Sequence, residues 1–180
     1  MADEFQELFA NGYRARRERQ YAESRAIFFE GVRRAAEQAN RPALAEALCG
    51  LAQAERDIGN CAAAHHQYAN AALLYREIGP PSRLAYALRH EGDLARELNK
   101  PEEAESAYRE AETIYRGLGN DARLDLANTL RGLALVKEGT GPAQASKPLW
   151  TEARDLYLRC DVRVGVEKCD QKLRELSGVG

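Results

Sequence analysis

The sequence has few of the residues on which catalytic and metal sites usually depend. Among its 180 residues are three histidines, four cysteines and one tryptophan. The cysteines (Cys49, Cys61, Cys160 and Cys169) form no CxxC pair, so neither a zinc ribbon nor a disulfide framework is indicated. Cys61 and His65 lie four residues apart, but nothing places further ligands beside them. We therefore expect no metal site, no cofactor, and reduced cysteines that contribute to packing.

Sequence motifs of enzymes and of membrane segments are missing as well. There is no glycine-rich phosphate loop, no HExxH and no GxSxG sequence, so catalysis is not expected. No run of 18 apolar residues occurs, and residues 1–4 have neither a basic start nor an apolar core. These absences predict a cytoplasmic protein that has no transmembrane helix, no signal peptide and no membrane partner.

The sequence also lacks an excess of charge of one sign. Charged residues make up 30% of the chain, yet the net charge is only -2, and acidic residues are interleaved with arginine and lysine. This distribution is typical of solvated helix surfaces with ion pairs within each helix. Nucleic acid is therefore not expected as a partner.

What the sequence does contain is a pattern that recurs about every 40 residues. A small residue is followed four positions later by an aromatic residue and three positions after that by another small residue, which places all three on one face of a helix. The four copies are Ser24, Phe28 and Gly31; Ala64, Tyr68 and Ala71; Ala104, Tyr108 and Ala111; and Ser146, Trp150 and Ala153. Small residues let two helices approach closely, and the aromatic ring fills the space beside them.

Each copy is preceded by a second helical stretch and a turn. A small residue stands twelve positions before each copy, at Gly12, Ala52, Gly92 and Ala134. The predicted turns between the two helices are Gly59-Asn60, Asn99-Lys100-Pro101 and Gly139-Thr140-Gly141-Pro142, where Gly or Asn can end a helix in a left-handed conformation and Pro can begin the next. The repeated unit is therefore a pair of helices, and its period lies in the range of helical solenoids.

The fourth unit is offset by 42 residues from the third. We place the two extra residues between Gly119 and Leu130, because Leu130 to Ala134 then matches Leu48 to Ala52. The end of the chain, from Val162 to Leu176, has one apolar stripe on an otherwise polar helix. Such a helix is suited to cover the last unit of a solenoid, and docking of a partner or of a second copy is the alternative.

These repeats resemble the tetratricopeptide repeat (TPR), in its subtype of about 40 residues rather than 34. The resemblance covers about residues 4–176 and implies an all-α fold, a right-handed α-α superhelix of four helix pairs plus a C-terminal capping helix. A single domain over residues 1–180 is predicted, with repeats at about 4–39, 42–79, 82–119 and 122–160 and the capping helix at 162–177. This subtype is found in regulators, kinesin light chains and related adaptor proteins.

The resemblance also implies that the first helix of each pair lines a concave groove. The groove residues carried over by repeat position are Phe9, Tyr13, Arg16, Gln53, Arg56, Tyr86, Arg89, Asp93, Arg96, Asn128 and Arg131. Arginine side chains at equivalent positions could bind an acidic peptide or helix. Acidic residues on the same face could instead neutralise these arginines, and we favour that interpretation.

Two groove positions depart from the family's best-known binding mode. TPR proteins that hold chaperone tails use a lysine and an asparagine where this sequence has Phe9 and Tyr13, so chaperone-tail binding is not expected. The two aromatic residues could form a patch for an apolar side chain or for dimerisation, or they could pack against neighbouring helices.

The expected function is a non-enzymatic scaffold that binds a peptide or helix of another protein in its groove. A ligand- or peptide-sensing module of a regulatory system is one alternative, and a homodimeric structural TPR protein is another. The sequence does not identify the partner.

Overall fold

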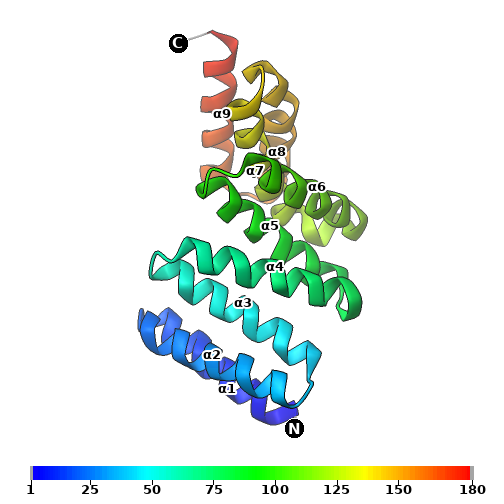
Figure 1. Cartoon of the computed structure of the whole chain (residues 1–180). Helices are drawn as coiled ribbons and strands as arrows, with labels where there is room; N and C mark the ends of the chain where they lie inside the picture. The colour runs from blue at the N-terminus through cyan, green and yellow to red at the C-terminus, as the bar shows by residue number, and fades with distance from the viewer. Residues whose placement is uncertain (1, 179–180) are drawn as a thin grey trace. The chain divides into compact units, whose positions relative to one another are not determined.

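The computed structural model describes residues 2–178, and within that range the chain is all-α (Figure 1). The helices are α1 (Ala2–Arg17), α2 (Tyr21–Glu37), α3 (Arg41–Asp57), α4 (Cys61–Ile78), α5 (Pro81–Glu97), α6 (Pro101–Leu118), α7 (Arg123–Thr140), α8 (Lys147–Arg159) and α9 (Arg163–Ser177). Two short 3-10 helices, η1 (Gly119–Ala122) and η2 (Ala143–Ser146), flank α7. Helices packed in sequential pairs confirm the predicted fold class.

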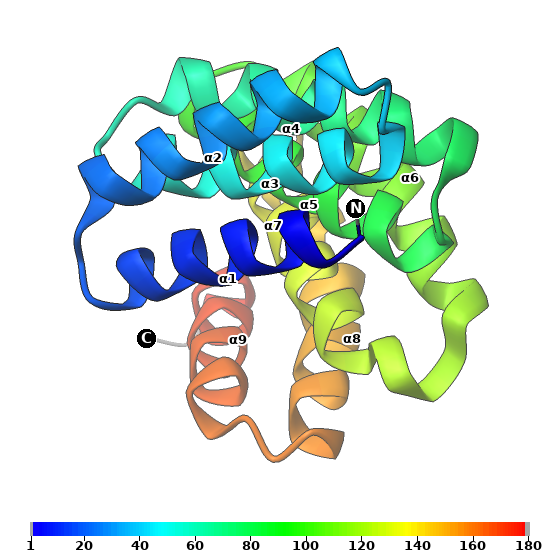
Figure 2. The ribbon, with the colours of Figure 1, turned by 90° about the horizontal axis from the view of Figure 1, so that it is seen from below.

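The chain divides into two compact units, and the boundary falls within α5. Unit 1 extends to Leu94 and unit 2 begins at Ala95. In unit 1, α1 to α4 pack each against the next as antiparallel neighbours, as Figures 1 and 2 show. In unit 2, α6 packs on α7, α7 on α8, and α8 on α9. A single domain over residues 1–180 stays a prediction.

Phe28 of α2 organises the core of unit 1. Gly12 on α1 and Gly50 on α3 lie against the Phe28 ring. A Cβ atom added to Gly12 would lie 2.7 Å from the ring, and one added to Gly50 would lie 2.2 Å from it. The ring is fully buried and is flanked by Phe9 and Tyr13, with ring centroids 6.0 and 4.9 Å away. Phe28 therefore fills the space between the first helix of its own pair and the first helix of the next, and the two glycines leave room for its ring.

Tyr108 of α6 has the same role in unit 2. A Cβ atom added to Gly132 on α7 would lie 2.5 Å from the Tyr108 ring. Gly132 therefore corresponds to Gly50, which requires the two extra residues of the fourth repeat to precede it, as the sequence comparison suggested. They are accommodated in η1, because four residues separate α6 from α7 whereas two separate α4 from α5.

The turns follow the predicted chemistry only in part. Gly59 and Asn99 do adopt positive φ, at 84° and 57°. Gly139 does not end a helix, because α7 continues to Thr140 and the chain leaves it at Gly141 in an extended conformation. The second helix of the fourth repeat was expected from residue 142, but η2 precedes α8, which begins at Lys147 with Pro148 in its first turn.

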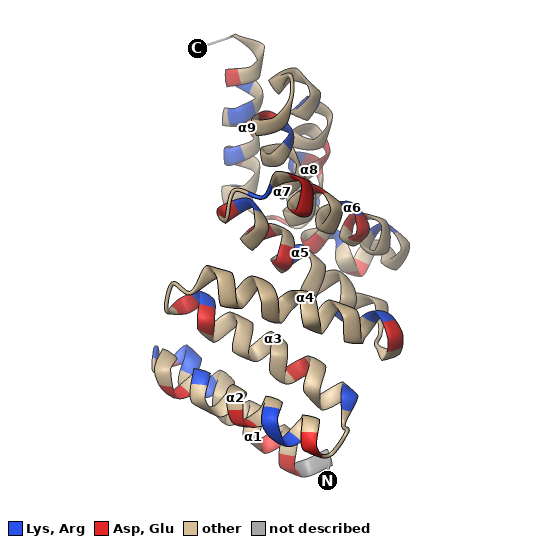
Figure 3. Ribbon diagram, in the orientation of Figure 1, with Lys and Arg blue, Asp and Glu red and all other residues tan. Residues whose placement is uncertain are grey.

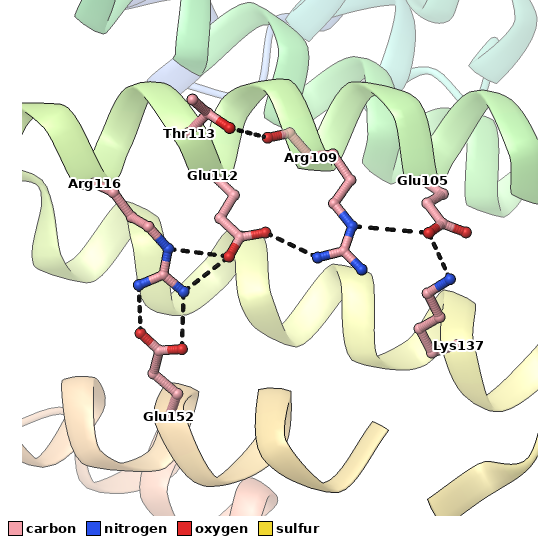
Figure 4. A network of polar contacts seen from close by, with 7 residues as sticks. All are labelled: Glu105, Arg109, Glu112, Thr113, Arg116, Lys137 and Glu152. Carbon is pink, nitrogen blue, oxygen red and sulfur yellow. Dashed lines mark hydrogen bonds and ion pairs between the residues drawn. The ribbon is translucent and has the colours of Figure 1, made fainter. Parts of the chain in front are cut away.

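Charged residues outside the cores are mostly paired within or between helices. Figure 3 shows many charges of both signs on the ribbon, while α4 carries only Arg76 and Glu77. In unit 2, Arg116 of α6 is bidentate to Glu152 of α8 at 2.6 and 2.9 Å (Figure 4). The same network extends along α6 and reaches α7, where Lys137 Nζ lies 2.5 Å from Glu105. These pairs tie second helices to their neighbours and account for much of the balanced charge.

Candidate functional site: the face formed by the first helices

An open groove lies between the first helices of the first two repeats. It has a volume of about 630 Å³ and lies within unit 1. Its lining residues are Phe5, Gln6, Phe9, Ala10 and Tyr13 of α1, and Asn40, Pro42, Ala43 and Glu46 at the beginning of α3. Glu46 is the only acidic residue among them, and none of them is basic. We call this cavity the α1–α3 groove.

The sequence places these residues on one wall because of their spacing. Phe5, Phe9 and Tyr13 are four residues apart and share a face of α1. Opposite them, the Asn40 side chain accepts a hydrogen bond from the Ala43 amide at 3.1 Å and so caps the start of α3. The position of α3 at the groove is therefore fixed by a local hydrogen bond and by the core beneath.

The two aromatic residues predicted for the site have different environments. Phe9 is only 5% exposed and packs in the core with Phe5 and Phe28, so packing accounts for most of its surface. Tyr13 is half-buried, and burial raises the pKa of its hydroxyl well above the usual value, with Glu46 adding to the shift. The Tyr13 hydroxyl is therefore protonated at neutral pH and can donate a hydrogen bond.

Next to the groove, Arg16 of α1 is held by α3. Its Nε lies 2.5 Å from Asp57 Oδ2, and its NH1 donates to Gln53 Oε1 at 2.8 Å. The hydrogen bonds to Asp57 raise the pKa of Arg16, which stays charged. Gln53 in turn donates to the Tyr86 hydroxyl of α5 at 3.0 Å. One hydrogen-bonded series thus connects the first helices of three repeats within unit 1.

Arg89 contributes to a cluster on α5. Its NH2 donates to His90 Nε2 at 2.8 Å, and its NH1 lies 3.4 Å from Asp93 Oδ2. Burial is the main cause that lowers the pKa of His90, and a neutral ring is required for Nε2 to accept from a guanidinium. The His90 ring also stacks on Tyr68, 5.1 Å away, and lies edge-on to Tyr86. Arg89 is therefore engaged with a carboxylate and an imidazole of its own helix.

Eight of the eleven predicted site residues lie in unit 1, on the first helices α1, α3 and α5. They are Phe9, Tyr13 and Arg16 of α1, Gln53 and the half-buried Arg56 of α3, and Tyr86, Arg89 and Asp93 of α5. The remaining three lie in unit 2. Arg96 is half-buried near the end of α5, Asn128 of α7 accepts a hydrogen bond from the Tyr157 hydroxyl at 2.8 Å, and Arg131 lines a separate small pocket.

The sequence-based site omitted several residues that line the α1–α3 groove. Gln6, Ala10, Asn40 and Pro42 were not selected, although Gln6 and Ala10 each lie about one helical turn before a predicted residue, Phe9 and Tyr13. The capping signal of Asn40, followed by Pro42, marks the start of α3 in the sequence. It indicates where the helix begins but not that its first turn borders a cavity.

The structure also bears on metal binding and nucleophilic chemistry. Residues 2–178 contain no group of three or more His, Cys, Asp or Glu side chains placed to hold a metal ion. Burial raises the pKa of Cys49 to about 12 and that of Cys169 to about 11. Both thiols are therefore protonated at neutral pH and lack the thiolate that a nucleophile requires. No helix in the described part of the chain is long and apolar enough to cross a membrane.

Comparison with known proteins gives matches among solved structures. No protein-family model matches the chain, and no curated protein matches its sequence. The crystal structure of BtubC (BKLC) from P. vanneervenii is similar with a TM-score of 0.66 and 16% identity, over 96% of this chain and 79% of that one. A putative kinesin light chain with nearly identical TPR-like repeats, from Podosopora anserina, has a TM-score of 0.62 and 11% identity, over 98% and 96% of the two chains.

A third similar structure is that of MamA protein, with a TM-score of 0.55 and 16% identity over 99% of this chain and 94% of that one. At these identities the comparisons concern the fold and not the ligands. They extend over nearly the whole chain and agree with the helix pairs described above. In its fold, the chain is a TPR-like repeat protein.

Proposed function

We propose that the protein is a non-enzymatic scaffold that binds a peptide or helix of another protein on the face formed by its first helices. The TPR-like fold is typically a protein-interaction module. The observation that carries the proposal is the α1–α3 groove, which is open, about 630 Å³ in volume and lined largely by apolar side chains. Grooves of this kind receive the apolar face of an amphipathic helix or the side chains of an extended peptide.

The chemistry of the groove favours a particular occupant. Phe5, Phe9 and Ala43 supply an apolar floor, and Glu46 supplies a carboxylate at the border. An apolar side chain with a basic residue close to it fits this lining. The proposed contact residues in unit 1 include those predicted there from the sequence: Phe9, Tyr13, Arg16, Gln53, Arg56, Tyr86, Arg89 and Asp93. For Arg96, Asn128 and Arg131 of unit 2, the role stays a prediction from the sequence.

The arginines support a second candidate, recognition of an acidic peptide. Arg16 is bonded to Asp57, and Arg89 contacts Asp93 and His90. A ligand carboxylate at these arginines would have to replace or share existing partners, and their internal pairing offsets part of the attraction. The apolar groove is therefore the better-supported contact.

A pull-down from extract of the native cell, read by mass spectrometry, distinguishes binding in the α1–α3 groove from recognition of an acidic peptide. Ala10 is exposed and lines the groove, so Ala10→Arg should fill it and abolish retention of the partner. The control is Ala26→Arg, which places the same charge on an exposed position of α2 and should retain the partner. An Arg89→Ala/Arg96→Ala variant tests the acidic peptide.

Retention by Ala10→Arg at the level of the wild type would contradict the groove proposal. Loss in the double arginine variant alone would favour the acidic peptide instead. If the wild type retains no specific protein, the sensing module or a homodimer becomes the better explanation. Light scattering then distinguishes the two, because a homodimer has twice the monomer mass and a small-ligand sensor need not.

A further inference from the structure

A second, smaller pocket lies within unit 2, where the capping helix meets the fourth repeat. It has a volume of about 190 Å³ and lies between α7, α8 and α9. Its lining residues are Arg131 and Leu135 of α7, Trp150 of α8, and Lys168, Gln171 and Lys172 of α9. Three of the six are cationic and none is acidic. This pocket is separate from the α1–α3 groove, and the inference drawn from it does not depend on the function proposed above.

Arg131 is the unusual member of this lining. Its Nε is buried and has no hydrogen-bond acceptor, and no ion pair or hydrogen bond of Arg131 is found among residues 2–178. A buried donor without an acceptor costs about 1–3 kcal/mol, and more when the group is charged. Several other arginines of this protein are paired with carboxylates, as Arg16 and Arg116 are. The environment of Arg131 therefore lacks an acceptor that a ligand could supply.

The charges around the pocket do not cancel. Lys172 is shared between Glu138, at 3.4 Å, and Glu175, at 3.1 Å. Glu138 also accepts a hydrogen bond from the Trp150 indole at 2.5 Å, which fixes the tryptophan ring in the wall. Lys168 has no ion pair in the described part of the chain. The three cations of the lining thus face two carboxylates, Glu138 and Glu175, which leaves an excess of one positive charge at the pocket.

The other lining residues are the polar Gln171 and two apolar side chains, Leu135 and Trp150. Leu135 is half-buried, and Trp150 is buried. A strongly hydrated anion gains little from such walls, whereas an acid with an apolar substituent can place its carboxylate at the cations and its hydrocarbon on Leu135 and Trp150. The volume of the pocket suits a group of that size and excludes a helix.

We propose that this pocket binds a carboxylate that carries an apolar substituent, with Arg131 as the main anion partner and Lys168 as the second. A peptide C-terminus with a terminal apolar residue and a free small carboxylic acid both present this chemistry. Guanidinium–carboxylate pairing is directional and charge-assisted, so Arg131 contributes more than Lys168.

The lone tryptophan provides the assay, because Trp150 lines the pocket and is the only tryptophan of the chain. The full chain is titrated with N-acetyl-leucine and, separately, with N-acetyl-leucinamide, which has the same shape without the charge. Inorganic phosphate is the third probe, and a short peptide ending in leucine, with and without C-terminal amidation, is the fourth. Binding is followed by tryptophan fluorescence and by calorimetry, so that a spectroscopically silent event is still measured.

We expect saturable binding of N-acetyl-leucine and weaker binding of the amide and of phosphate. Arg131→Gln should raise the Kd about tenfold or more, and Lys168→Gln about threefold, as expected for loss of a charge-assisted bond and of an exposed cation. Arg159→Gln is the matched control, because Arg159 is an exposed arginine of α8 outside the pocket. It should leave the Kd unchanged. A peptide that binds more tightly than N-acetyl-leucine identifies a C-terminus as the natural source, and equal affinity identifies a small acid.

Several results would overturn the proposal. Equal binding of the acid and the amide would show that charge is not recognised, and phosphate that binds as tightly as N-acetyl-leucine would show a general anion site. If Arg159→Gln raised the Kd as much as Arg131→Gln does, the effect would come from the net charge of the protein and not from the pocket. Absence of binding in both assays would also contradict it. If Arg131→Gln fails to fold by circular dichroism, the exposed Lys168→Gln variant decides, since it leaves the buried packing intact.

Discussion

Replacement of Gly50 by alanine should destabilise unit 1 even though alanine is the better helix former. Gly50 lies inside α3, where alanine would gain about 1 kcal/mol in helix propensity. The added Cβ would lie 2.2 Å from Cε1 and 2.3 Å from Cδ1 of Phe28, far inside van der Waals contact. Phe28 is fully buried, and Phe9 and Tyr13 flank its ring, so the ring has little room to move.

The magnitude follows from these two opposing effects. Overpacking of a well-filled core costs about 1–3 kcal/mol, which exceeds the gain in propensity. An approach as close as 2.2 Å puts the cost in the upper part of this range, at about 2–3 kcal/mol, so the expected net loss in the free energy of unfolding is about 1–2 kcal/mol. Gly139→Ala is the control, because Gly139 is helical and a Cβ there meets nothing within 4 Å. That substitution should be neutral or slightly stabilising.

Urea unfolding followed by circular dichroism measures both substitutions. The same Gly50→Ala change in a Phe28→Leu background completes a double-mutant cycle, and the smaller side chain should relieve the clash. A coupling energy of about 0.5 kcal/mol or more is expected. The reasoning would be refuted if Gly50→Ala were as stable as the wild type, or if its cost were the same in both backgrounds.

Three further predictions concern the ion pairs and the number of domains. Arg25→Ala should lower the free energy of unfolding in urea by about 2 kcal/mol, because it removes the partner that lies 2.6 Å from the Glu55 carboxylate, and Glu55 is only 4% exposed. A loss no larger than that of an ordinary surface substitution would contradict this. Glu152→Gln should cost less than about 1 kcal/mol and nothing at high salt, since its pair with Arg116 is largely exposed. Arg116 lowers the pKa of Glu152 from its usual value of 4.5 in the folded protein. The small contribution of this ion pair to stability is therefore present above pH 4.5 and is lost as the pH falls through the lowered folded-state pKa. A difference in stability between Glu152→Gln and the wild type that persists in acid would refute it. If the chain is one domain, the fluorescence of Trp150 in unit 2 and the circular dichroism of the whole chain should report the same urea midpoint, whereas separate midpoints would show two domains.

Several features of the fold could be read from the sequence because they are local or periodic. The spacing of Ser24, Phe28 and Gly31 defines one face of a helix, and its recurrence defines the helix pairs. Gly59 and Asn99 end helices as their backbone preferences predict. The placement of the extra residues before Gly132 also followed from the repeat alone, since the position facing Tyr108 must be small.

Other turns depended on packing that no short stretch of sequence encodes. Arg19 and Ala39 adopt positive φ between helices, at 62° and 49°, although neither residue prefers that conformation. Tertiary packing of the flanking helices holds them there. Gly139 shows the reverse case, because a residue that could end a helix remains inside α7.

The candidate site likewise has features that the sequence predicts and features that only tertiary packing determines. The repeat and its resemblance to the TPR selected the helices that form the site, and the spacing along α1 put Phe5, Phe9 and Tyr13 on one wall. The tertiary structure decided which side chains are already engaged, since Arg16 and Asp57 are 41 positions apart in sequence and meet only when α1 packs beside α3. It likewise left Arg131 without an acceptor and placed Lys168 of the capping helix at the same pocket. Periodicity specifies the face of a helix, whereas cavities and ion pairs are properties of the space between helices, which only their packing defines.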